Sequence, residues 1–142
     1  MDLEPDADLL SKLVQSGHSL VGPAVAARGN PFLIIGHNYE NDHSLERVPL
    51  YYPDLKDGDI VGGIGGCSLL VHRDIFSKVD FSGYNGVNAI PGRFTCDDEY
   101  FQIKVWEALK IRPRVLVSAG GWHYHSDGYG YRLLGQKRLW TE

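Results

Sequence analysis

The sequence predicts an α/β fold with a mixed sheet, in a single domain over residues 1–142. Extended apolar segments at 19–24 and 32–36 alternate with helical patterns at 5–16 and 96–110, and this alternation is typical of the class. The composition is 43% hydrophobic, 11% aromatic and 23% charged, as in an ordinary globular domain. We therefore expect a folded chain with a core of its own rather than a disordered one.

The two predicted helices have recognisable starts and apolar stripes. Pro5 suits the first turn of the earlier helix, and Thr95 and Asp98 have the spacing of a capping box at the start of the later one. The stripe of the earlier helix consists of Leu9, Leu10, Leu13 and Val14. The stripe of the later helix consists of Phe101, Val105, Ala108 and Leu109.

The rest of the chain divides into short strands and loops. Apolar runs at 67–72 and 115–118 predict two further strands. Residues 37–58 are mostly polar and 82–94 are rich in glycine, so both segments are expected to be loops.

The charge balance disfavours a nucleic-acid ligand. The net charge is -4 and the pI is about 5.8, whereas a protein that binds a phosphate backbone usually presents a basic surface. The basic residues are concentrated late in the chain. They form either a solvated surface or a local site for a phosphate-bearing ligand. They are Lys104, Lys110, Arg112, Arg114, Arg132, Lys137 and Arg138.

Cysteine usage and hydropathy indicate the compartment. Cys67 and Cys96 form no CxxC pair, which excludes a zinc knuckle, and two cysteines make no disulfide framework. We expect two reduced thiols, as in a reducing compartment. No apolar run approaches the ~18–20 residues of a membrane span, and the acidic N-terminus is unlike a signal peptide. The chain is therefore expected to be cytoplasmic, without a membrane span.

A glycine cluster at 62–66 precedes an apolar run. It lacks both the helix that comes after a GxGxxG motif and the Lys-Ser/Thr ending of a P-loop. Two interpretations stay open. The cluster is a structural bend that uses the conformational freedom of glycine, or it is a floor on which a sugar lies close to the main chain.

Three adjacent acids, Asp97, Asp98 and Glu99, open the later helix. The helix dipole stabilises carboxylates at this end, so capping alone accounts for them. The alternative is a general base, in which one carboxylate accepts the proton of an attacking hydroxyl while another caps the helix.

Two histidines, His123 and His125, are two positions apart. On a strand their side chains share one face, about 6–7 Å apart along the chain, so one or both can bind a metal. A pair without metal is the other interpretation. The Glu that a cupin site would add is missing from positions 126–129. His37 and His43 lie in the polar segment without a ligand pattern, and we interpret them as surface residues.

In their order along the chain, these motifs resemble family 2 glycosyltransferases of the GT-A fold. The glycine-rich turn leads to an apolar strand and then to an Arg-acid-hydrophobic-Phe helix start at 73–76. An acidic pair followed by an aromatic comes next, and then a helix, a strand and a histidine. The opening, residues 2–10, is similar to the segment after the DxD motif of that family. The resemblance covers roughly residues 2–126.

The resemblance implies an inverting, nucleotide-sugar-dependent transferase with a glycan or other hydroxyl acceptor. Asp98 would activate the acceptor, with Asp97 as the neighbouring candidate. The residues bordering the substrates would be Gly65, Gly66, Glu99 and Trp122. A divalent metal, Mn or Mg, would be bound by Asp2, as the last residue of DxD, and by His123 or His125.

The family pattern extends beyond this sequence. Its nucleotide base binds in an N-terminal βαβα half ahead of DxD, and the sequence begins at or just after the place of that motif. We therefore expect an acceptor-side half that is inactive alone, and an open sheet edge that favours self-association. Two alternatives are a non-catalytic remnant that binds carbohydrate or a partner, and a small metal-binding α/β protein.

Overall fold

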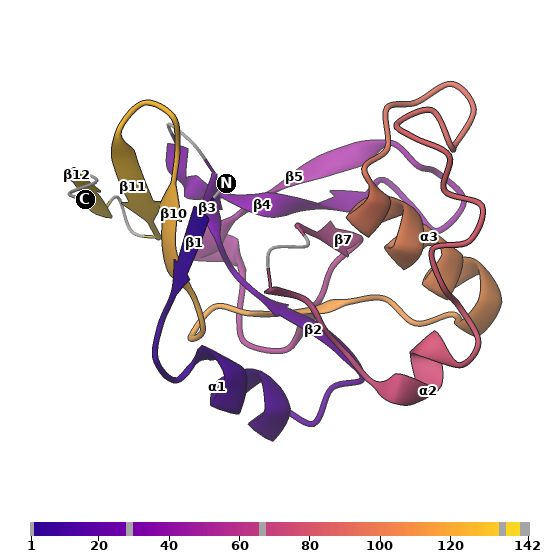
Figure 1. Ribbon diagram of the computed structural model, residues 1–142, viewed down its shortest axis with the longest axis horizontal. Coiled ribbons are helices and arrows are strands. Elements are labelled where there is room, and N and C mark those ends of the chain that lie inside the picture. Colours follow the sequence, from indigo (N-terminus) through magenta and orange to yellow (C-terminus); the bar gives the residue numbers. More distant parts are fainter. Residues whose placement is uncertain (1, 28–29, 66–67, 134–135, 140–142) are drawn as a thin grey trace.

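The computed structural model describes residues 2–27, 30–65, 68–133 and 136–139 (Figure 1). The fold is mixed α/β, as predicted, and it contains more sheet, built mostly from short strands, than helix. The helices are α1 (Leu9–Gln15), α2 (Arg73–Phe76) and α3 (Asp97–Leu109), and a 3-10 turn forms η1 (Tyr52–Asp54). None of the helices in these ranges combines the length and the hydrophobicity needed to cross a bilayer.

A mixed sheet forms the centre of the molecule. Its order is β6 (Asp59–Ile60), β9 (Arg114–Leu116), β2 (Leu20–Pro23) and β8 (Leu70–Val71). Strands β2 and β9 are parallel, whereas the outer pairs are antiparallel. Leu20 packs with α2 and α3 on one face of β2, and Val21 packs with α1 on the other. Helices therefore cover both faces of this sheet, as expected.

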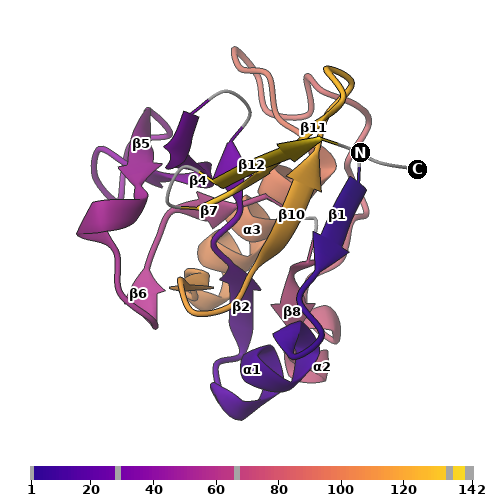
Figure 2. The ribbon, with the colours of Figure 1, turned by 90° about the vertical axis from the view of Figure 1, so that its left-hand side faces the viewer.

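An antiparallel sheet joins the two ends of the described chain (Figure 2). Its order is β1 (Asp2–Pro5), β10 (Gly121–Tyr124), β11 (Tyr129–Arg132) and β12 (Gln136–Leu139). The predicted helix at 5–16 is too long, because its first residues extend β1 and the amide of Asp6 donates to the Gly120 carbonyl at 3.0 Å. Only two residues of its predicted stripe are buried, since Leu10 is 67% and Val14 59% exposed.

The third sheet corrects the predicted loop at 37–58. It consists of β3 (Ala26–Ala27), β4 (Asn30–Tyr39) and β5 (Arg47–Tyr51), in that order, and β7 (Gly63–Ile64) also pairs with β4. Strand β5 is an outer strand, where Pro49 is tolerated. Of its five residues only Leu50 is buried, so β5 lacks the alternating buried face that identifies a strand.

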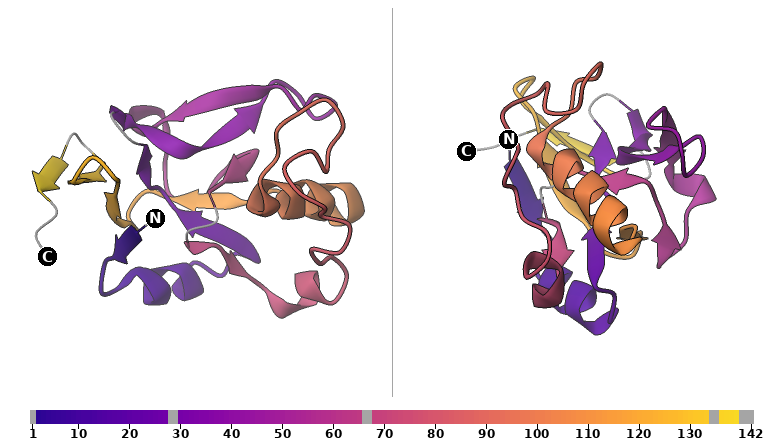
Figure 3. Two further views of the ribbon diagram at one scale, coloured as in Figure 1. Left: turned by 45° about the horizontal axis from the view of Figure 1, so that its top comes forward. Right: turned by 90° about the vertical axis from the view of Figure 1, so that its right-hand side faces the viewer.

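Helix α3 agrees with the predicted bounds to within a residue at each end. The predicted capping box is wrong, because Cys96 is the N-cap residue and the buried Thr95 hydroxyl makes no hydrogen bond with the described residues. Phe101 and Val105 of the predicted stripe are buried, whereas Ala108 is exposed. Figure 3 shows the segment from α2 to α3 looping out beside the helix.

Candidate functional site

A cavity of about 370 Å³ lies beside the first turn of α3. Asp98 and Glu99 border it from the helix, and Gly65 borders it from the end of β7. His37 of β4 and Arg47 of β5 complete its polar lining. Three predicted site residues from two distant segments therefore meet at one cavity.

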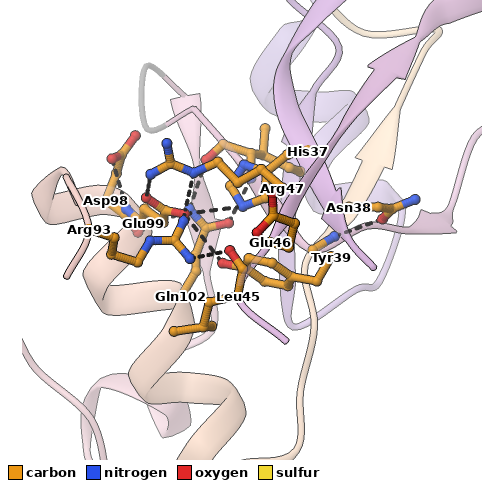
Figure 4. Close-up of polar contacts among 12 residues, drawn as sticks. His37, Asn38, Tyr39, Leu45, Glu46, Arg47, Arg93, Asp98, Glu99 and Gln102 are labelled. Atoms are coloured by element: carbon orange, nitrogen blue, oxygen red, sulfur yellow. Dashed lines mark hydrogen bonds and ion pairs between the residues drawn. The ribbon is translucent and has the colours of Figure 1, made fainter. Parts of the chain in front are cut away.

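The carboxylate of Glu99 is the buried centre of this site (Figure 4). Its side chain is 8% exposed. Arg47 donates from Nε to Oε1 at 3.0 Å and from Nη2 to Oε2, and Arg93 donates from Nη2 to Oε1 at 2.5 Å. Glu99 thereby joins the 82–94 loop and β5 to α3, a structural role that differs from the predicted substrate contact.

His37 and Tyr39 of β4 also face this carboxylate. His37 Nε2 lies 3.3 Å from Glu99 Oε1, and the Tyr39 hydroxyl donates to the same oxygen at 3.4 Å. Burial lowers the pKa of His37 to about 4, and burial raises the pKa of Tyr39 to about 12. Both side chains are therefore neutral near pH 7. The surface interpretation of His37 is wrong, whereas His43 is exposed as expected.

No sequence motif assigns a functional role to His37, Arg47 or Arg93, yet one signal points to such partners. Glu99 lies four residues before Ile103, so the two share the face of α3 that is buried. A carboxylate on a buried helix face requires cations or hydrogen-bond donors from elsewhere in the chain. The identity of those donors depends on the tertiary fold.

The low pKa of His37 predicts acid-sensitive stability. Between pH 6.5 and 4 the unfolded chain binds a proton at this position that the folded chain does not, so stability falls as the pH falls. We expect the free energy of unfolding to drop by about 2–3 kcal/mol more in the wild type than in His37→Gln between pH 7.5 and 4. Urea unfolding at both pH values measures it. His43→Gln should keep the wild-type dependence, and parallel losses in all three proteins would contradict the prediction.

The two candidate bases differ in position. Asp98 is partly buried and borders the cavity, and its Oδ1 accepts the backbone N–H of Glu99 at 2.8 Å. Asp97 is exposed, and its Oδ1 accepts the N–H of Asp98 at 3.0 Å. Asp97 and Asp98 therefore each accept a hydrogen bond from the backbone N–H of the next residue in the first turn. Cys96 also borders the cavity, and burial raises the pKa of its thiol.

The glycine cluster is needed for close packing. A Cβ on Gly63 would lie 2.7 Å from the His37 ring, and a Cβ on Gly65 would lie 2.6 Å from Ile35 Cγ2. The structural interpretation therefore accounts for both glycines, while Gly65 also borders the cavity. Gly66 and Cys67 lie outside the described residues.

The predicted metal residues lie elsewhere, since β10 and α3 occupy opposite ends of the molecule (Figure 1). His123 is buried, with Nδ1 3.1 Å from the Ala26 carbonyl oxygen and 3.0 Å from His125 Nε2. Trp122 packs its ring 4.2 Å from the guanidinium carbon of Arg138. The structure does not bring these three predicted residues to the Asp98 cavity.

The divalent metal site that the resemblance implies has no complete set of ligands among the described residues. They include no group of three or more His, Cys, Asp or Glu residues that could hold an ion, and the two imidazoles of the pair contact each other. The backbone of Asp2 pairs with Tyr124 of β10, while its side chain is outside the described set. The Mn or Mg ion therefore stays a prediction.

Comparisons with known proteins bear on the fold. No protein-family model matches the sequence, and no curated protein does. The chain is similar to the solved structure of A197 from STIV, with a TM-score of 0.61 and 14% sequence identity. The match covers 99% of this chain and 63% of A197, so this chain spans less than two thirds of that protein. The likeness shows a shared fold.

Proposed function

We propose that this chain is the acceptor-side part of an inverting, nucleotide-sugar-dependent glycosyltransferase, with Asp98 as the base. One observation carries the proposal. Two of the four residues that the family pattern places beside the substrates, Gly65 and Glu99, border the same 370 Å³ cavity as the carboxylate that it assigns as base. A concave site with a few converging polar groups is the usual form of a small-molecule site.

In the proposed reaction, a hydroxyl oxygen of the acceptor attacks the anomeric carbon of the donor sugar. The bond from that carbon to the phosphate oxygen breaks, and the nucleotide leaves with the bonding electrons. The acceptor proton passes to the carboxylate of Asp98. This transfer makes the attacking oxygen more nucleophilic as the new bond forms, and it is the contribution of a general base.

Among the carboxylates that border the cavity, Asp98 suits this role better than Glu99. Both oxygens of Glu99 accept hydrogen bonds from arginine, and Oε1 also lies near His37 and Tyr39. A guanidinium group has only hydrogen-bond donors and stays charged, so Arg47 and Arg93 hold this carboxylate in place. Glu99 therefore fixes the wall of the cavity, and Asp98 stands at its edge.

The experiment that tests the proposal is a ligand titration of the chain monitored by amide NMR. Nucleotide sugars and mono- or disaccharide acceptors are added separately, and the resonances of Gly65, Asp98 and His37 are recorded. A ligand at a hundredfold excess over its Kd adds about 2.7 kcal/mol to the free energy of unfolding. We expect at least one saccharide to shift these resonances and to raise the melting temperature.

Two outcomes have distinct meanings. Binding at the cavity without any transfer, even when the donor, the acceptor and the N-terminal nucleotide-binding half are all present, would favour a non-catalytic carbohydrate-binding function. If no saccharide and no nucleotide sugar perturbs the three resonances, the proposal is wrong.

A further inference from the structure

A second cavity, of about 550 Å³, lies at the opposite end of α3 from Asp98. The helix has thirteen residues, so its ends are about 18 Å apart. The lining includes three cations, one aromatic ring, one carboxylate and one exposed apolar side chain. These are Lys110, Arg112, Arg114, Trp106, Asp42 and Ile60.

The guanidinium group of Arg112 packs against two aromatic rings. Its central carbon lies 4.1 Å from the Trp106 ring centroid and 4.9 Å from that of Tyr39. The side chain is 11% exposed. These two ring contacts and the burial restrict the guanidinium group, so little conformational freedom remains to be lost when it binds a ligand.

The acidic partner of this guanidinium is distant and solvated. Among the described residues, Arg112 makes one ion pair, with Asp42 at 3.6 Å, which is longer than a hydrogen bond. The Asp42 side chain is 73% exposed. A largely buried cation with such a weak partner favours an anion that can reach it.

We propose that this cavity binds a phosphorylated small molecule. The phosphate oxygens would accept hydrogen bonds from Arg112 in a bidentate arrangement, with Lys110 as a second charge. Arg114 adds positive charge beside them while its Nη1 donates to the Gly58 carbonyl at 2.8 Å. Trp106 and Ile60 offer apolar surface to the rest of the ligand, and the volume lies in the range of small-molecule sites. This cavity is separate from that of Asp98, and the inference does not depend on the transferase proposal.

Calorimetric titration with inorganic pyrophosphate and with adenosine monophosphate tests the inference. We expect both probes to bind, with an affinity that falls as the salt concentration rises. Tighter binding of adenosine monophosphate would show that the apolar wall contributes. Lys110→Gln should weaken binding about tenfold, the usual size of a charge-assisted hydrogen bond. Lys78→Gln, at an exposed lysine elsewhere, should leave binding unchanged.

A variant that is expected to bind more tightly provides a second test, because misfolding would not raise the affinity. Asp42→Asn removes the carboxylate that competes for Arg112, and its position is exposed, so we expect binding about threefold tighter. If Lys110 and Arg112 only offset the carbonyl groups at the end of α3, neither probe will bind the wild type. That result, or equal affinities in Lys110→Gln and Lys78→Gln, would overturn the inference.

Discussion

Replacing Glu99 by Gln is expected to lower the free energy of unfolding by about 3 kcal/mol. The substitution preserves the shape of the side chain but removes the charge that two guanidinium groups share, at 3.0 Å for Arg47 Nε and 2.5 Å for Arg93 Nη2. Arg93 is 15% exposed and cannot be rehydrated without moving the loop that carries it. Breaking a buried ion pair from one side costs about 3–5 kcal/mol, and we take the lower end because Arg47 is 42% exposed.

The same helix offers a matched control for this measurement. Glu107 pairs with Lys104 at 2.7 Å, and both side chains are solvated. Glu107→Gln should therefore change the free energy of unfolding by less than about 0.5 kcal/mol. Urea unfolding at pH 7 compares the two variants. Equal losses would mean that Glu99 is not the point at which the 82–94 loop and β5 are held to α3.

Replacing Asp98 by Asn is expected to have the largest effect on activity. Under the proposed function, and with the N-terminal nucleotide-binding half supplied, the variant lacks the group that accepts the acceptor proton, and turnover should fall about 10²–10⁴-fold. The amide oxygen of Asn still accepts the Glu99 N–H that Asp98 binds at 2.8 Å, so stability should change by less than about 1 kcal/mol. KM should change little, because substrate binding does not depend on the lost charge.

The comparison with Asp97→Asn separates the two candidate bases. Asp97 is exposed and caps the N–H of Asp98, so its replacement should leave turnover near the wild-type value. The pH profile gives a further readout, because the acidic limb set by the base should disappear only in Asp98→Asn. Equal losses of turnover in both variants would argue against Asp98 as the base.

Local patterns predicted the elements that bury an apolar face. Helix α3 was located well because its apolar residues recur at helical spacing, and strand β2 because it is a continuous buried run. Strand β1 was missed because Glu4 and Pro5 are exposed and Leu3 is only half-buried, and β5 because its burial is limited to Leu50. Such strands form through pairing with distant segments, and no local periodicity reports that pairing.

Part of the candidate site was likewise predicted from the sequence, and part of it was not. The order of motifs brought Gly65 and Asp98 together correctly, although they are separated by more than thirty positions. The two arginines that bind Glu99 are Arg47 of β5 and Arg93 of the loop before α3. Neither is separated from Glu99 by the regular spacing of a helix or a strand. Charge partners of this kind depend on the fold and cannot be found from spacing alone.

The connectivity of the sheets has a consequence for how the chain acquires its structure. β1 pairs residues 2–5 with 121–124, and β2 pairs with residues 114–116, so the first two strands complete their sheets with the last quarter of the sequence. Closing such long loops loses chain entropy before the contacts compensate for it, and folding rates fall with this kind of sequence separation. During synthesis the first strands leave the ribosome well before their partners exist. Residues 2–5 therefore stay unpaired at least until residues 121–124 have been made, and closure of this sheet is expected to be slow.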